Sequence, residues 1–174
     1  MDISKINFYL ILQFTEFKKV CPEEIDAIVR IEQSGFTPEE AGSKATFIER
    51  IKNFSETFLV AIEDDEIRGF ICAIRTNARY VEDWMYEAQA KPDDSGKYLN
   101  VLSVAIAPEY RGKHIGSDLL INLEKIAKKL GIDGISLTCL ESKVGFYEKN
   151  GYSNKGKSSS EHAGEIWYNM KKEL

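Results

Sequence analysis

A short segment of the sequence, from Arg111 to Ser117, combines two glycines with two cationic side chains. It follows a nearly unbroken apolar run at 98–106 and precedes apolar positions at helical spacing, so it should connect a buried strand to a helix. Backbone N–H groups in the first turn of a helix have no intrahelical acceptor and carry partial positive charge, and glycines let an anion approach the backbone closely. With Arg111 and Lys113 beside them, these donors suit a diphosphate. An ordinary strand-turn-helix connection with a solvated basic turn is the alternative interpretation.

A second segment, Phe146 to Tyr152, places Tyr147 inside a short predicted helix. A phenol has an ordinary pKa of about 10, so it holds its proton at neutral pH and can donate it to a leaving group. Isolated tyrosines usually pack into a core instead. The segment alone leaves both roles open.

Together, the two segments resemble the GNAT superfamily of N-acetyltransferases. The stretch Arg111-Gly112-Lys113-His114-Ile115-Gly116 is similar to the superfamily's acetyl-CoA motif, R/Q-x-x-G-x-G/A, and Phe146-Tyr147-Glu148-Lys149-Asn150-Gly151-Tyr152 is similar to its F/L-Y-E-K-x-G-F/Y segment. His114 stands where the motif has a glycine, which is tolerable if the loop needs the N–H of that residue more than a positive φ. The resemblance implies an α/β fold with a mixed, mostly antiparallel sheet of about six or seven strands flanked by helices. It also implies that CoA wedges between two splayed central strands.

The resemblance assigns roles to individual residues. Tyr147 would act as general acid and protonate the CoA thiolate as it leaves. The backbone of the central strand would pair with the pantetheine arm as an extra strand does, and the Val104 N–H could polarise the thioester carbonyl. The implied cofactor-binding residues are Leu102, Ser103 and Val104 on the strand and Arg111, Gly112, Lys113, His114, Ile115, Gly116 and Ser117 in the loop. No metal is implied.

Within the superfamily, the stretch from Cys139 to Tyr152 and the run Phe58-Leu59-Val60-Ala61 are similar to the arylalkylamine N-acetyltransferases. In that group two histidines on the central strand relay protons from the amine, and the matching positions here hold Tyr98 and Asn100. Neither the histidine relay nor an aromatic-amine substrate is therefore carried over to this chain.

Some group must still take a proton from the substrate ammonium, because only the free amine attacks a thioester. The sequence offers Glu141, Asp83, Glu87 and Tyr98 acting through water, although carboxylates of this kind are more often solvated surface charges. The predicted acceptor-binding residues are Phe36, Tyr98, Asn100 and Glu141.

Periodicity and turn residues predict the elements that position these groups. The predicted strands cover 7–19 (one strand or a bent pair), 57–62 and 66–75 (a hairpin), 98–106, 134–140 and 165–171. The predicted helices cover 22–35, a segment that starts at 37–40 and ends near 54, 115–130 and 142–150. Residues 76–97 are expected to form a long loop with one helical turn.

The composition is that of one globular domain over residues 1–174, with 43% hydrophobic and 29% charged residues. A formal net charge of -5 disfavours a general nucleic-acid binder. The three cysteines fit neither a disulfide framework nor a zinc site, which indicates reduced thiols in the cytoplasm. His162 is predicted to be exposed in a polar loop, and the early apolar stretch at 8–12 is too short to span a membrane. We therefore expect a cytoplasmic monomer or homodimer that binds neither nucleic acid nor membrane.

The expected activity is transfer of an acetyl group from acetyl-CoA to the primary amine of a small molecule, by direct attack in a ternary complex. Two alternatives are acetylation of a peptide or protein, at its N-terminus or a lysine, and a CoA-binding module without catalysis. Tyr147 speaks against the module. The acidic, aromatic stretch at 80–94 would attract a cationic acceptor, and it is equally typical of a solvated loop.

Overall fold

A seven-stranded sheet organises the computed structural model, which describes residues 14–174. The strand order is β1-β2-β3-β4-β5-β7-β6, and all neighbours are antiparallel except the parallel pair β4 and β5. The strands are β1 (Glu16–Lys19), β2 (Phe58–Glu63), β3 (Glu66–Thr76), β4 (Tyr98–Ile106), β5 (Gly134–Cys139), β6 (Ser153–Lys157) and β7 (Tyr168–Glu173). The helices are α1 (Ile25–Gly35), α2 (Lys44–Phe54), α3 (Ile115–Lys129) and α4 (Val144–Lys149). The predicted fold class is confirmed.

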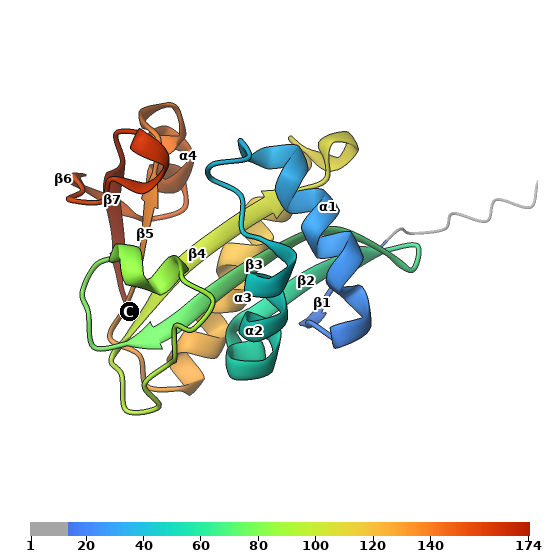
Figure 1. Cartoon of the computed structure of the whole chain (residues 1–174), viewed down its shortest axis with the longest axis horizontal. Coiled ribbons are helices and arrows are strands. Elements are labelled where there is room, and N and C mark those ends of the chain that lie inside the picture. Colours follow the sequence, from blue (N-terminus) through green and yellow to red (C-terminus); the bar gives the residue numbers. More distant parts are fainter. Residues whose placement is uncertain (1–13) are drawn as a thin grey trace, which may run out of the picture.

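Helices cover both faces of the sheet, with α1 and α2 on one side and α3 on the other (Figure 1). Successive side chains of a strand point to opposite faces. In β2, Phe58 and Val60 accordingly pack with α1 and α2, whereas Leu59 and Ala61 pack with α3. Burial on both faces explains why the central strands are continuous apolar runs rather than alternating ones.

The two parallel strands β4 and β5 pair along only part of their length. Their register runs from Tyr98 opposite Gly134 to Val101 opposite Leu137, and it stops there although β4 continues to Ile106. On its other edge β4 carries one extra residue, Leu102, between its partners on β3. Beyond Val101 the two strands diverge (Figure 1), which leaves one edge of β4 free of β5.

One predicted helix start is wrong. Residues 37–40 form a closed turn instead, in which the Thr37 N–H donates to the Glu40 carboxylate at 2.9 Å and the Ala41 N–H to the Thr37 carbonyl at 2.9 Å. The carboxylate bond is the glutamate half of a capping box, here satisfied within a single turn, and the backbone bond closes that turn. Helix α2 begins after Ser43, whose hydroxyl accepts the Thr46 N–H at 3.1 Å.

The edges of the sheet were the least predictable part. The strand expected at 7–19 is described only from residue 14, and β1 confirms its last part. Strand β6 was missed because all of its residues are exposed and polar or glycine, so it has no apolar alternation. The last strand, β7, begins at Tyr168, three residues after the predicted start. The hairpin, the strand at 98–106 and the loop at 76–97 with its single 3-10 turn (Asp83–Tyr86) are confirmed.

Candidate active site

The divergence of β4 and β5 opens a cleft of about 850 Å³. Its walls come from the end of α1, the free edge of β4, the loop before α3, the end of β5, α4 and the segment at 162–167. The predicted residues that line it are Phe36, Leu102, Ser103, Val104, Arg111, Gly112, His114, Ile115, Gly116, Ser117 and Tyr147. One cavity therefore joins both sequence motifs and the central strand.

The free edge of β4 forms one long wall of the cleft, from Val101 to Ile106. Backbone N–H and C=O groups on such an edge can pair with an extended ligand as they would with another strand. This edge fits the amide-bearing pantetheine arm that the resemblance assigned to Leu102, Ser103 and Val104.

The loop before α3 presents backbone donors to the cleft. The first intrahelical bond runs from the Asp118 N–H to the His114 carbonyl at 3.0 Å, so the N–H groups of the preceding first turn have no acceptor within the helix. Gly112 has a φ of 75°, which a side chain would strain. This geometry fits a diphosphate at the positive end of the α3 dipole.

The two cationic side chains of the loop, Arg111 and Lys113, make contacts within the protein rather than standing free to bind a phosphate. Arg111 donates from Nε to the Ile106 carbonyl at 3.0 Å and from Nη2 to the Ser34 carbonyl at 2.9 Å, so it ties the loop to β4 and α1 while lining the cleft. Lys113 does not line the cleft, and its Nζ lies 4.6 Å from the centre of the Tyr110 ring. The backbone, more than these side chains, forms the cradle.

His114 adopts the left-handed conformation, with φ 66° and ψ 1°. The loop therefore keeps the backbone shape of the missing glycine, although a histidine stands at this position. A non-glycine residue in this region costs on the order of 1 kcal/mol or more.

We expect His114→Gly to raise the free energy of unfolding by about 0.5 to 1 kcal/mol, because relief of strain exceeds the entropy that glycine adds to the unfolded chain. Urea denaturation measures the change. Lys113→Gly is the matched control, since Lys113 does not have a positive φ and the same substitution should destabilise there. A destabilised His114→Gly protein would contradict the argument.

Tyr147 lies on α4 and lines the cleft, with its ring against Phe146 (5.0 Å between centroids) and Tyr152 (5.9 Å). Within residues 14–174 its hydroxyl has no hydrogen-bond partner. Burial raises the pKa of this phenol above its ordinary value, with a smaller contribution from Cys139. The group is thus a protonated, unengaged donor facing the cavity, as a general acid must be.

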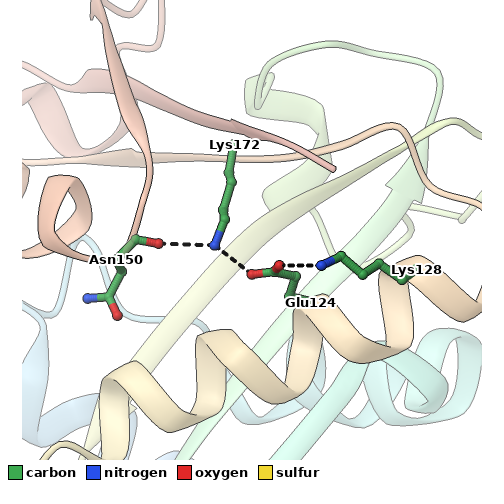
Figure 2. A network of polar contacts seen from close by, with 4 residues as sticks. All are labelled: Glu124, Lys128, Asn150 and Lys172. Atoms are coloured by element: carbon green, nitrogen blue, oxygen red, sulfur yellow. Dashed lines mark hydrogen bonds and ion pairs between the residues drawn. The ribbon is translucent and has the colours of Figure 1, made fainter.

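A polar network holds α4 against the rest of the molecule (Figure 2). Lys172 on β7 donates to the Glu124 carboxylate on α3 at 2.6 Å and to the Asn150 carbonyl at 3.2 Å, just after α4. Lys128 donates to the second oxygen of Glu124 at 2.8 Å. Because Asn150 is one helical turn from Tyr147, this network positions the tyrosine relative to the second half of α3.

The opposite end of the cleft contains residues that sequence reasoning missed. Glu32 is a buried carboxylate that accepts the Ser103 hydroxyl at 2.5 Å and the Gly42 N–H at 3.1 Å, and burial raises its pKa. A signal for it existed: Glu32 lies four residues after Ile28, on the apolar face of α1.

Aromatic side chains form the rest of the end of the cleft that contains Glu32. The rings of Tyr86 and His162 stack at 4.5 Å, and the indole of Trp167 donates to the His162 carbonyl at 2.8 Å. His162 is half-buried and lines the cleft, so its predicted exposure is wrong. Asp83 contributes by accepting the Ser160 hydroxyl at 2.5 Å, which fixes the segment that carries His162.

Three predicted acceptor residues lie outside the cleft. Tyr98 and Asn100 belong to the part of β4 that still pairs with β5, where the sheet leaves no opening. Asn100 is fully buried and bonds the hydroxyls of Thr76 and Ser136, while the phenol of Tyr98 accepts from Arg79. The third, Glu141, is exposed, and neither it nor the other proposed carboxylate bases line the cavity.

Comparison with known proteins agrees with this geometry. The model of the acetyltransferase (GNAT) family matches residues 25–152. The chain belongs to this family. It is 30% identical over 118 residues to glucosamine 6-phosphate N-acetyltransferase 1 of Dictyostelium discoideum, and the match covers 66% of this chain and 69% of that protein.

Solved structures show the same GNAT fold. Ard1 from Thermoplasma volcanium has a TM-score of 0.73 at 17% identity, with 92% of this chain and 97% of that chain covered. The PaiA N-acetyltransferase from Thermoplasma acidophilum, in complex with coenzyme A, has a TM-score of 0.68 at 22% identity, with 92% and 99% covered. The chain is thus a GNAT-family acetyl-CoA N-acetyltransferase, as predicted. The similarity to the arylalkylamine group stays a prediction.

Two further observations concern residues 14–174 as a whole. None of their helices combines the length and the apolar character needed to cross a membrane. No group of three or more His, Cys, Asp or Glu side chains among them is placed to hold a metal ion.

Proposed function

We propose that this GNAT acetyltransferase transfers an acetyl group from acetyl-CoA to the primary amine of a small molecule, by direct attack of the amine. The observation that carries the proposal is the unengaged Tyr147 phenol in the same cleft as the free β4 edge and the α3 cradle. The relative from Dictyostelium, a glucosamine 6-phosphate N-acetyltransferase, supports a small-molecule amine as acceptor.

Each part of the cleft has a task in this proposal. Acetyl-CoA supplies an activated acetyl thioester. The first-turn N–H groups of α3 bind its diphosphate, and the free edge of β4 holds the pantetheine arm. The Val104 N–H polarises the thioester carbonyl, and Tyr147 donates the proton that the departing thiolate needs.

The acceptor enters at the end formed by Glu32, Phe36, Tyr86 and His162. The Glu32 carboxylate attracts a positively charged amine, and the rings of Tyr86 and His162 offer flat surfaces to its carbon skeleton. Of the acidic stretch at 80–94, only Tyr86 lines the cleft. The carboxylates of that stretch therefore do not line the space that the acceptor would occupy.

A turnover screen tests the proposal directly. Acetyl-CoA is incubated with amines, amino sugars, polyamines, amino acids and short peptides, and free thiol is measured. Transfer to at least one small amine is the expected result. Transfer to peptides alone would favour a protein acetyltransferase, and tight CoA binding without any transfer would favour a non-catalytic module.

Activity is expected to rise with pH along a limb set by the acceptor amine. Burial raises the pKa of Glu32, yet a carboxylate remains a much weaker base than an alkylamine, whose pKa is about 10. The amine should therefore react from its free-base form, and kcat/KM measured for two amines of different basicity should show limbs that differ accordingly. One limb near neutrality shared by both amines would mean that the enzyme supplies the base, and His162→Gln and Glu32→Gln would then locate it.

A further inference from the structure

A second cavity, of about 260 Å³, adjoins the acceptor end of the cleft. It shares Glu32, Glu40, Tyr86, Leu102 and His162 with the cleft, so the two spaces lie side by side. Its remaining wall is built by Ala41, Gly42 and Ser43, which lead into α2, and by Thr46 and Arg50 of that helix. The CoA cradle and Tyr147 take no part in it.

Arg50 is a buried cation without an ion-pair partner in the described part of the chain. Only 4% of the residue is exposed. Its Nη1 lies 3.8 Å from the Cys72 sulfur, its Nη2 donates to the Tyr86 carbonyl at 3.4 Å, and its Nε has no partner within residues 14–174. A guanidinium has five N–H donors and does not lose its charge, so this one is poorly satisfied.

The buried Lys171 shows the more usual arrangement. It is 3% exposed and pairs with Glu173 at 2.8 Å. A buried charge is costly unless an opposite charge or several hydrogen bonds compensate it. Within the described residues Arg50 has no ion pair and only the two long hydrogen bonds. Its guanidinium lies 5.1 Å from the centre of the Phe47 ring, is attracted to the Glu32 carboxylate, and lines a cavity.

Other groups in the second cavity also favour an anion. Ser43 caps α2, and its hydroxyl shares a hydrogen bond with that of Thr46 (2.9 Å) at the positive end of the helix dipole. Two carboxylates, Glu32 and Glu40, lie on the side shared with the cleft. The positive end of the cavity is thus distal to the cleft and the negative end adjoins it.

We propose that Arg50 and the start of α2 bind an anionic group, a carboxylate or a phosphate, carried by the acceptor amine. The acceptor is then a small molecule with an ammonium at one end, drawn to Glu32 and Glu40, and an anion at the other. This inference rests on the proposed function, since it specifies the substrate class of the same cleft.

The test uses matched pairs of amines that differ in the anion: glucosamine 6-phosphate and glucosamine, phosphoethanolamine and ethanolamine, β-alanine and its amide. For the wild-type enzyme, kcat/KM should favour the anionic member of at least one pair by about tenfold or more. The pair that responds tells phosphate from carboxylate. In Arg50→Met the preference should fall to within about threefold of unity, with the neutral member little changed.

Two further variants distinguish a loss of anion binding from a loss of folding. Arg50→Lys keeps the charge without the planar fork and should retain part of the preference. Lys171→Met removes a buried cation outside both cavities and should leave the preference intact. Melting temperatures are recorded for all variants.

Binding provides a readout that does not need turnover. With CoA present, the anionic member of at least one of the three pairs should raise the melting temperature of the wild type but not of Arg50→Met, whereas its neutral partner should not. If no amine is acetylated, the proposed function is wrong. The shift in melting temperature then tests the inference by itself. The inference is overturned if no anionic member is preferred or stabilising, or if Arg50→Met weakens both members of a pair equally.

Discussion

Tyr147→Phe is expected to lower kcat by about ten- to a thousandfold while the affinity for CoA stays within a few fold. The phenol lines the cleft without a hydrogen-bond partner among residues 14–174, and its pKa is raised, so its proton is available only to a ligand. Removing the hydroxyl takes away a donor used in the transition state and leaves the packing against Phe146 and Tyr152 in place. Thiol-release kinetics and a CoA titration measure the two quantities.

Tyr152→Phe is the matched control. The Tyr152 hydroxyl is buried and has no hydrogen-bond partner among residues 14–174, its ring lies 5.9 Å from that of Tyr147, and Tyr152 does not line the cleft. The same substitution there should leave kcat unchanged. An unchanged rate for Tyr147→Phe would reduce Tyr147 to a packing residue, provided that its melting temperature matches that of the wild type.

CoA is expected to stabilise the protein by about 2.7 kcal/mol at a hundredfold excess over its dissociation constant, and Gly116→Asp should abolish this effect. Gly116 lies in the first turn of α3, and a Cβ placed on it would come within 3.3 Å of the Phe146 ring. An aspartate there narrows the cleft and sets a negative charge against the diphosphate. Thermal denaturation with and without millimolar CoA gives the measurement.

Gly145→Asp provides the comparison for this test. Gly145 lies on α4, has open space around its Cβ position and does not line the cleft, so the stabilisation by CoA should persist. A wild-type melting temperature that CoA leaves unmoved would refute the binding site itself.

The cofactor half of the site could be predicted from the sequence because its information is local. The strand at 98–106, the loop with Gly112 and Gly116, and the helix after it are contiguous, and each has its own turn or periodicity signal. Even there, the left-handed backbone of His114 was not predicted, because most histidines adopt a negative φ and only the glycine of the motif at this position hinted at a positive one.

The acceptor half could not be predicted because it is assembled from distant segments. Glu32, Tyr86 and His162 come from three parts of the chain and meet only in the folded sheet. Periodicity describes which face a residue occupies, and it carries no information on which other segment lies opposite. Tyr98 and Asn100 failed for a related reason: their position on β4 was known, but the point at which β5 parts from it was not.

Because β4 and β5 pair over a short length, a change that stabilises the sheet between them would lower the activity of this protein. Four residue pairs join the strands, from Tyr98 with Gly134 to Val101 with Leu137, and the ladder ends where the cleft begins. Each further pair would add backbone hydrogen bonds to the middle of the sheet and remove the same length of open edge from the ligand. Selection for thermostability at this point of the sheet would therefore tend to close the catalytic opening. Stabilising substitutions that preserve function should be sought away from it and from the second cavity, at the outer strands.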